Sequence, residues 1–263
     1  EGLKKYSEVR YLQDKYDEEN QLYKHYNFSD NLAAILGMTH LDYSNELDQM
    51  YYFNARENLD QPTNTSINNI TRTNYFAVTQ AKTAKAFQHL SGYLGTNQFD
   101  RIMRQFLSEW SFKHPKPADL QRVFQKQTGK DLSWFFEKIL KTNEKIDYSI
   151  LRKSENEVLI KNKGTIPAPL IIKGNHGGET QFTQWYEGFQ GKKWLNIPSG
   201  NFEKIVIDPD RVMLELYRTN NTLKTDGLFK RAEPLNVQFS GFFNNSRYSQ
   251  INYLPSLAWN TYD

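Results

Sequence analysis

Residues 132–164 read LSWFFEKILKTNEKIDYSILRKSENEVLIKNKG, and the spacing of apolar residues changes within this stretch. Before Lys145 the apolar residues follow helical spacing, and we expect a short helix at Leu132–Leu140. After Lys145 they alternate with polar residues, first from Ile146 to Ile150 and then from Val158 to Ile160. The change predicts a helical region followed by a β-rich region.

The chain before Lys145 shows helical spacing in several further segments. We expect helices at Leu3–Tyr16, Glu46–Asn58, Asn74–Leu94, Phe99–Trp110 and Asp119–Gln127. The stretch from Asn58 to Thr73 is rich in Asn, Thr and Pro and indicates a loop. Gly95 follows the third helix directly, where glycine commonly ends a helix.

The chain after Lys145 has the pattern of an antiparallel sheet. Short alternating runs are separated by glycine-containing turns at Asn162–Gly164, Asn175–Gly178 and Pro198–Gly200, which favours a β-sandwich. A further strand is expected at Leu235–Phe243. We therefore assign the α+β class, with a helical region at residues 1–145, a β-sandwich at 146–222 and a C-terminal extension at 223–263.

Composition argues against several functional classes. The 33 basic and 30 acidic residues are interspersed and show no clustered basic face, so nucleic-acid binding is not expected. The absence of cysteine removes thiol nucleophiles, disulfides and cysteine-ligated metals. No apolar run reaches about 18 residues, so we expect no transmembrane segment. Composition leaves the cellular compartment open.

Common catalytic motifs are also missing from the sequence. The chain has no His-x-x-x-His pair, no Gly-x-Ser-x-Gly elbow and no glycine-rich phosphate-binding loop. We interpret its histidines as surface or structural residues. They are His25, His40, His89, His114 and His176.

The first eight residues carry the strongest chemical signal. Glu1-Gly2-Leu3-Lys4-Lys5-Tyr6-Ser7-Glu8 resembles a segment of the aminopeptidase N-like gluzincins, which follows a helix with a His-Glu-x-x-His motif in that family. The resemblance implies that Glu1 is the third zinc ligand. Two imidazoles and one carboxylate leave zinc an open position for water, and the glutamate of the motif then acts as general base.

The resemblance extends over residues 1–221 through the order and spacing of weaker motifs. These are Asn74 to Gly95 followed by Phe99, Asp131 to Phe136, Val158 to Gly164, Pro169, Trp185 to Gly188, Asp208-Pro209, Glu215, and Arg218 to Asn221. It implies the helical half of a gluzincin catalytic domain followed by an immunoglobulin-like β-sandwich. Related long bacterial proteins carry further β-rich segments, which favours a location in the cell envelope or outside the cell.

One position departs from the family pattern. The family has a tyrosine fifteen residues before the glycine that corresponds to Gly95, within Tyr-x-Lys, and its phenol is thought to stabilise the tetrahedral oxyanion. This chain has Gln80-Ala81-Lys82 there. Tyr75 lies about 1.5 turns away and is no simple substitute. The amide of Gln80 can donate a hydrogen bond, and the alternative interpretation of Gln80 is a polar residue in a helix interface.

These observations lead to one leading interpretation and two alternatives. The chain is expected to be part of a zinc-dependent aminopeptidase acting on peptides, with zinc in the intact parent but no zinc or activity in this chain alone. The first alternative is a non-catalytic pseudopeptidase that binds peptides or proteins. The second is a carbohydrate- or surface-binding protein, suggested by four aromatic residues that are more often core residues. They are Trp185, Tyr186, Phe189 and Trp194.

Overall fold

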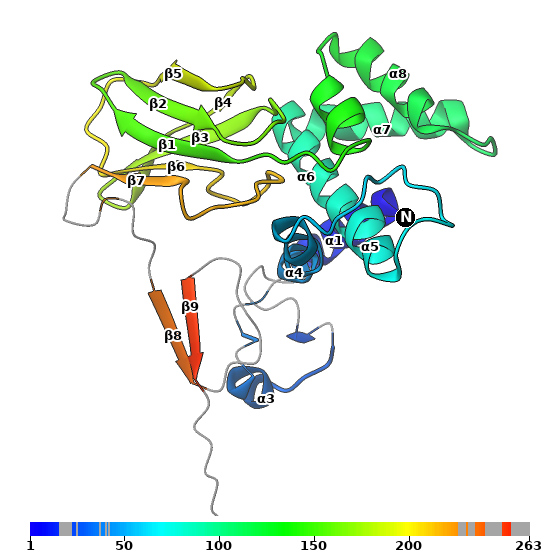
Figure 1. Cartoon of the computed structure of the whole chain (residues 1–263), viewed down its shortest axis with the longest axis horizontal. Helices are drawn as coiled ribbons and strands as arrows, with labels where there is room; N and C mark the ends of the chain where they lie inside the picture. The colour runs from blue at the N-terminus through cyan, green and yellow to red at the C-terminus, as the bar shows by residue number, and fades with distance from the viewer. Residues whose placement is uncertain are drawn as a thin grey trace, which may run out of the picture. The chain divides into compact units, whose positions relative to one another are not determined.

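The computed structural model describes residues 1–15, 23–24, 26–36, 38–39, 41, 43–225, 230, 235–239 and 249–253. Helices and mostly antiparallel strands occupy separate parts of these residues, which confirms the α+β class (Figure 1). Contacts divide the chain into two units, Glu1–Tyr6 with Tyr51–Ala232, and Ser7–Met50 with Glu233–Asp263. The division into three domains at residues 145 and 222 stays a prediction.

The helical region of the first unit comprises residues 1–6 and 51–140. Its elements are α1 (Gly2–Lys15), α4 (Tyr43–Arg56), α5 (Arg72–Phe76), η1 (Ala77–Lys82), α6 (Thr83–Leu94), α7 (Thr96–Trp110), α8 (Pro117–Thr128) and η2 (Trp134–Ile139), of which α1 and α4 extend into the second unit. The expected helices are all present, with somewhat different ends. The helix expected at Asn74–Leu94 runs through α5, η1 and α6, and η1 is a π-helical turn.

Aromatic side chains build the core of the helical region. Phe87 of α6 contacts Phe135 of η2 at a ring distance of 5.2 Å and Phe99 of α7 at 6.3 Å. Phe99 also packs on Phe124 of α8, at 5.6 Å. All four rings are buried. A chain with few aliphatic residues therefore obtains its core from large aromatic groups, each of which buries a large apolar area.

The sheet region of the first unit comprises residues 146–224. Its strands are β1 (Tyr148–Lys153), β2 (Glu157–Asn162), β3 (Leu170–His176), β4 (Glu179–Tyr186), β5 (Lys192–Asn196), β6 (Lys204–Ile207) and β7 (Thr222–Lys224). They form two antiparallel sheets with the strand orders β1-β2-β5 and β4-β3-β6-β7 (Figure 1). β1 overlaps the alternating run predicted from Ile146 to Ile150, and β2 includes the run predicted from Val158 to Ile160.

Alternation fixes which face of each strand is buried. In β2, Val158 and Ile160 are fully buried, whereas the alternate residues Leu159 and Lys161 are only partly covered. One glycine permits a close backbone approach beside β3. A Cβ atom on Gly188 would lie 1.9 Å from the carbonyl oxygen of Pro167, so this position requires glycine.

The second unit contains α3 (Asp30–Ile35), most of α1 and the first half of α4, together with β8 (Leu235–Phe239) and β9 (Ser249–Tyr253). The strand expected at Leu235–Phe243 begins where predicted, and its last four residues lie outside the described part. β8 and β9 pair in parallel, and neither this pairing nor α3 was predicted. None of the helices in the described residues combines the length and apolar character that crossing a membrane requires.

His89 of α6 joins the helical region to the sheet region. Its ring is fully buried, and Nε2 lies 2.8 Å from the carbonyl oxygen of Pro169. Because a carbonyl only accepts, Nε2 carries the proton, and Nδ1 accepts a long hydrogen bond of 3.5 Å from the backbone N–H of Leu214. Both nitrogens of the neutral ring are therefore satisfied. Burial lowers the pKa of His89 from 6.5 to about 4, against the opposing effect of Pro169.

Aromatic rings surround this histidine on both sides of the junction. His89 contacts Trp134 of η2 at a ring distance of 4.8 Å and Trp185 of β4 at 5.8 Å. Trp185 also packs against Tyr93 of α6 and leaves little room beside Gly92, where an added Cβ atom would lie 3.2 Å from its ring. α6 is thus enclosed by side chains from both regions.

Ionic and polar contacts complete the junction. The Asp208 carboxylate, which follows β6, accepts a hydrogen bond of 3.1 Å from Arg218 and one of 3.0 Å from the backbone N–H of Met213. Arg218 also donates to the hydroxyl of Tyr52 in α4, at 3.3 Å. Arg56 of α4 donates to the carbonyl oxygen of Leu216 with two nitrogens, at 3.1 and 3.2 Å. The two regions are therefore joined through α4 as well as α6.

Acidification should weaken the first unit through His89. The pKa of this side chain is about 4 in the folded protein and 6.5 ordinarily, so between these values the unfolded chain binds more protons. Stability should therefore rise with pH from about 4 to 6.5, by up to about 1.4 kcal/mol per pH unit. Urea unfolding at several pH values, compared between the wild type and His89→Gln, measures this slope.

The matched control is His114→Gln, because His114 is exposed. The control should keep the pH slope of the wild type, while His89→Gln should flatten it. Identical slopes in the wild type and His89→Gln would contradict a buried neutral His89.

Candidate functional site

The predicted zinc ligand, Glu1, lies at the exposed start of α1, and the next residue is buried. A Cβ atom on Gly2 would lie 2.3 Å from both Cβ and Cγ2 of Thr83, and 2.8 Å from the carbonyl oxygen of Thr79. Only glycine allows the start of α1 to approach η1 and α6 this closely. Glu1 is therefore one residue from a tight contact between two helices.

Tyr6 holds the first turn of α1 in this place. Its side chain is 3% exposed and contacts Phe99 at a ring distance of 5.4 Å and Phe87 at 5.9 Å. The backbone N–H of Lys5 donates to the carbonyl oxygen of Glu1 at 3.0 Å, and this is the first hydrogen bond of α1. An aromatic anchor and a glycine contact together fix the turn that carries Glu1.

Gln80 lies on the other side of the same contact. It is half-buried in η1, the π-helical turn that separates α5 from α6, and its neighbours Thr79 and Thr83 are the residues that touch Gly2. A π-helical turn widens the helix and is frequent at functional sites. The structure therefore places Glu1 and Gln80 in two adjoining turns, each next to a residue of the contact.

Tyr75, five residues before Gln80, lies in α5. Its ring packs edge-on against Phe76, with 5.3 Å between ring centroids. Its backbone carbonyl accepts a hydrogen bond from the hydroxyl of Thr79.

Lys82 anchors η1 to the segment that leads into the sheet region. It is fully buried, and Nζ donates a hydrogen bond of 2.7 Å to the carbonyl oxygen of Thr142. Burial lowers the pKa of this ammonium from 10.5 to about 8, although the nearby Asp60 carboxylate opposes the shift. Lys82, at the position that matches the family's lysine, is thus a buried, positively charged anchor. Its residue type alone did not indicate this burial.

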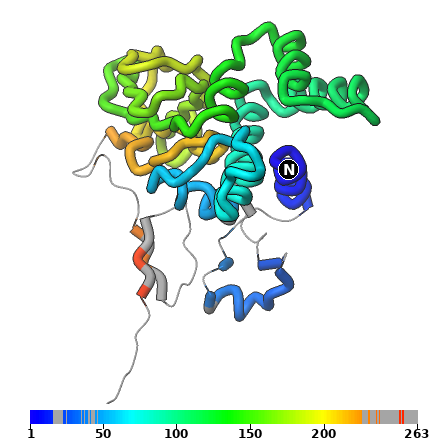
Figure 2. The backbone as a smooth tube through the Cα atoms, turned by 45° about the vertical axis from the view of Figure 1, so that its right-hand side comes forward, coloured from blue at the N-terminus to red at the C-terminus, as the bar shows by residue number. Residues whose placement is uncertain are grey.

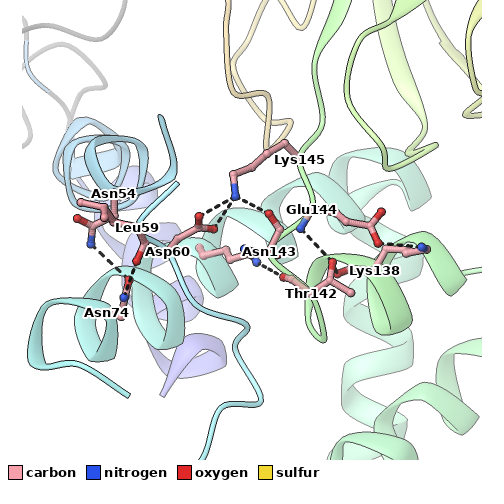
Figure 3. A network of polar contacts seen from close by, with 10 residues as sticks. Asn54, Leu59, Asp60, Asn74, Lys138, Thr142, Asn143, Glu144 and Lys145 are labelled. Carbon is pink, nitrogen blue, oxygen red and sulfur yellow. Dashed lines mark hydrogen bonds and ion pairs between the residues drawn. The ribbon is translucent and has the colours of Figure 1, made fainter. Parts of the chain in front are cut away.

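Asp60 and Lys145 complete this polar network (Figure 3). Lys145 Nζ lies 2.7 and 2.8 Å from the two carboxylate oxygens of Asp60, and 2.5 Å from the carbonyl oxygen of Asn143. On the other side, the side chain of Asn74 donates to the carbonyl oxygen of Leu59 at 2.8 Å. The loop before α5, the helix with Gln80 and the junction at Lys145 are therefore held by one set of contacts.

The motifs at the end of the sheet region form a second buried polar cluster. Glu215 is fully buried and accepts a hydrogen bond of 2.7 Å from the backbone N–H of Tyr148. Burial raises the pKa of its carboxyl group well above the ordinary value. Burial also raises the pKa of Asp208, against the opposing charges of Arg218 and Lys85. These residues hold β1 and the end of the sheet region together and do not reach Glu1.

None of the three described histidines has a recorded contact with Glu1. His89 is in the junction described above, His114 is exposed, and His176 lies 3.7 Å from Glu203 in the sheet region. The other two, His25 and His40, lie outside the described residues.

The aromatic residues behind the carbohydrate-binding alternative mostly serve packing. Trp185 lies against His89, and Phe189 contacts Tyr148 at a ring distance of 5.5 Å. The hydroxyl of Tyr186 donates to the carbonyl oxygen of Asn196 at 2.6 Å. Trp194 is exposed, with Arg152 5.2 Å above its ring. A single exposed tryptophan does not form a row of sugar-stacking rings.

The described residues do not fit a complete zinc site. They gather no group of three histidine, aspartate or glutamate side chains that could hold a metal. Glu1 offers one carboxylate, whereas a catalytic zinc needs three protein ligands. The candidate site in the described residues therefore consists of the Glu1 carboxylate at the start of α1 and the Gln80 amide in η1.

No model of a known protein family matches the chain, and no curated protein sequence matches it.

The close contact at Gly2 reverses the stability change that is expected when alanine replaces a helical glycine. In an unpacked helix, replacing glycine by alanine stabilises by about 1 kcal/mol. Here the added methyl group meets Thr83 and the backbone of Thr79, so Gly2→Ala should instead lower the free energy of unfolding by about 1–3 kcal/mol. Urea unfolding measures this change.

A double variant shows whether Thr83 causes the loss. Because Thr83→Gly removes the nearest atoms, Gly2→Ala with Thr83→Gly should cost less than the sum of the two single changes. The exposed residue Lys4 of the same turn is the control, and Lys4→Ala should have little effect. A stabilising Gly2→Ala would show that the start of α1 does not pack there.

Proposed function

We propose that this chain is part of a zinc-dependent aminopeptidase and supplies one zinc ligand, Glu1, and the residue beside the reacting carbonyl, Gln80. The supporting observation is the close contact of Gly2 with Thr79 and Thr83, which places the two residues in adjoining turns. Their separation of 79 positions in the sequence makes that proximity informative. The proposal requires two histidine ligands from polypeptide outside this sequence.

The chemistry assigned to this chain is limited to its own residues. When bound, zinc would lower the pKa of a water molecule and polarise the scissile carbonyl. Glu1 would be one of the residues that hold the metal. The amide N–H₂ of Gln80 would donate a hydrogen bond toward the oxygen on which negative charge develops. The anchoring of η1 by Lys82 would keep that amide in place.

A non-catalytic relative of such peptidases is the second candidate, and Gln80 itself is the observation that favours it. A neutral amide is a weaker acid than a phenol and stabilises a developing oxyanion less well. The second candidate would keep the same helix contacts and bind peptides without cleaving them.

Removal of the Glu1 carboxylate tests the ligand assignment. In a longer polypeptide that joins this chain to a His-Glu-x-x-His helix, Glu1→Ala should abolish stoichiometric zinc binding at micromolar metal, because only two protein ligands remain. Metal analysis after dialysis and hydrolysis of aminoacyl anilides are the measurements. Glu8→Ala is the matched control in the same helix and should retain zinc. Full activity of Glu1→Ala would refute the assignment.

Restoration of the tyrosine tests the role of Gln80. In the same longer polypeptide, Gln80→Tyr should raise kcat by about 10- to 100-fold, because it supplies a stronger donor to the oxyanion. Gln80→Leu should lower kcat further without changing zinc content. If hydrolysis is absent in both the wild type and Gln80→Tyr although zinc is bound, the non-catalytic candidate is preferred.

A further inference from the structure

The connection between α7 and α8 carries an exposed apolar tip. It comprises residues 111–116, and Figures 1 and 2 show it at the outer end of the helical region. Phe112 is fully exposed, and Leu107 in the last turn of α7 is 56% exposed. We use the name α7–α8 tip for Phe112, Lys113 and Lys116 of this connection together with Leu107 and Trp110 at the end of α7.

Phe112 has a backbone conformation that a large side chain rarely adopts. Its φ is 60°, in the left-handed region that favours glycine. The conformation turns the phenyl ring away from the protein instead of into the core. An exposed apolar ring held in a strained conformation has no role in packing, and such strain is commonly associated with function.

Local hydrogen bonds hold the tip in this shape. The backbone N–H of Ser111 donates to the carbonyl oxygen of Leu107 at 2.8 Å, and that of Lys113 donates to Trp110 at 3.0 Å. Lys116 N–H donates to the Asp119 carboxylate at 2.8 Å, which caps α8. The ring of Phe112 is therefore presented by an ordered turn, so that its insertion into a partner would need little further ordering.

Within residues 110–117 the charges have one sign, although the carboxylates of Glu109 and Asp119 flank this stretch. Residues 110–117 contain Lys113 and Lys116 and no carboxylate. Lys113 lies 5.9 Å from the centre of the Trp110 ring and donates to the carbonyl oxygen of Glu109 at 2.6 Å. Tryptophan and lysine beside a protruding phenylalanine match the layers of a membrane surface, where indole rings lie at the headgroup level and cations meet anionic lipids.

We propose that the α7–α8 tip inserts Phe112 into the surface of a lipid bilayer that contains anionic headgroups. The tip is convex, and a protein partner would have to offer a matching pocket, whereas a bilayer accepts a protruding ring without one. The lysines are placed to contact lipid phosphates while the ring enters the acyl boundary. Such an attachment is peripheral and independent of the peptidase proposal.

Vesicle sedimentation with the 263-residue chain tests the proposal. The chain should bind vesicles of phosphatidylcholine and phosphatidylglycerol, and Phe112→Ala should lower the partition coefficient by at least about tenfold, because a phenyl group is no longer buried. Phe53→Ala removes a ring that is 73% exposed on α4 and should bind as the wild type does.

Two further variants separate the ring, the charges and the fold. Phe112→Gly should bind as weakly as Phe112→Ala and unfold at the same or a higher temperature, because glycine adopts this φ freely. Lys113→Gln with Lys116→Gln should lower binding to anionic vesicles by about fivefold per lysine and leave binding to pure phosphatidylcholine unchanged.

Three results would overturn the proposal. They are no sedimentation of the wild type with anionic vesicles, wild-type binding by a folded Phe112→Ala, and equal losses in Phe112→Ala and Phe53→Ala. The first result would favour a protein partner with a pocket that receives Phe112.

Discussion

The first unit depends on polar side chains of one continuous helical stretch that are buried where the helical and sheet regions meet. Lys82 and His89 are both fully covered, and a buried polar group without a partner is costly. Among the described residues, Lys82 donates to the carbonyl oxygen of Thr142 and is attracted by the Asp60 carboxylate, and His89 bonds to the backbone at Pro169 and Leu214. The backbone partners lie after the helical region in the sequence, and those of His89 belong to the sheet region, so His89 is satisfied only when the sheet region is folded against the helix. Directional contacts of this kind fix orientation more closely than apolar packing alone does.

The polar bonds of the buried Lys82 and His89 also constrain the candidate site. The helical stretch in which Lys82 bonds to Thr142 and His89 bonds to the sheet region also carries Gln80 and forms the surface that receives Gly2. The position of Glu1 relative to Gln80 is therefore set by two kinds of contact, a glycine approach on one side of the helix and buried polar bonds on the other. The proposed peptidase role draws on this arrangement, while the α7–α8 tip projects from a different part of the helical region and would act separately.

Periodicity predicted most of the first unit because helices and strands here bury one face each. The helices around Phe87 and Phe99 and the strand around Val158 and Ile160 follow directly from apolar spacing. Residue type misled where a residue departs from its usual environment, since Lys82 would be expected on the surface and Phe112 in the core. The close approach of Gly2 to Thr79 and Thr83 joins residues far apart in the sequence, which local patterns do not contain. The parallel pairing of β8 and β9 was missed because the sequence pattern predicted no strand at Ser249–Tyr253.

The proximity of Glu1 and Gln80 is the central claim, and the absence of cysteine allows it to be measured directly. Cysteines introduced by Glu1→Cys and Gln80→Cys can each be labelled with pyrene, whose excimer emission requires two rings in contact. The doubly labelled, folded chain should show excimer emission that disappears in urea, and each singly labelled chain should show monomer emission alone. Monomer emission from the folded, doubly labelled chain would contradict the site.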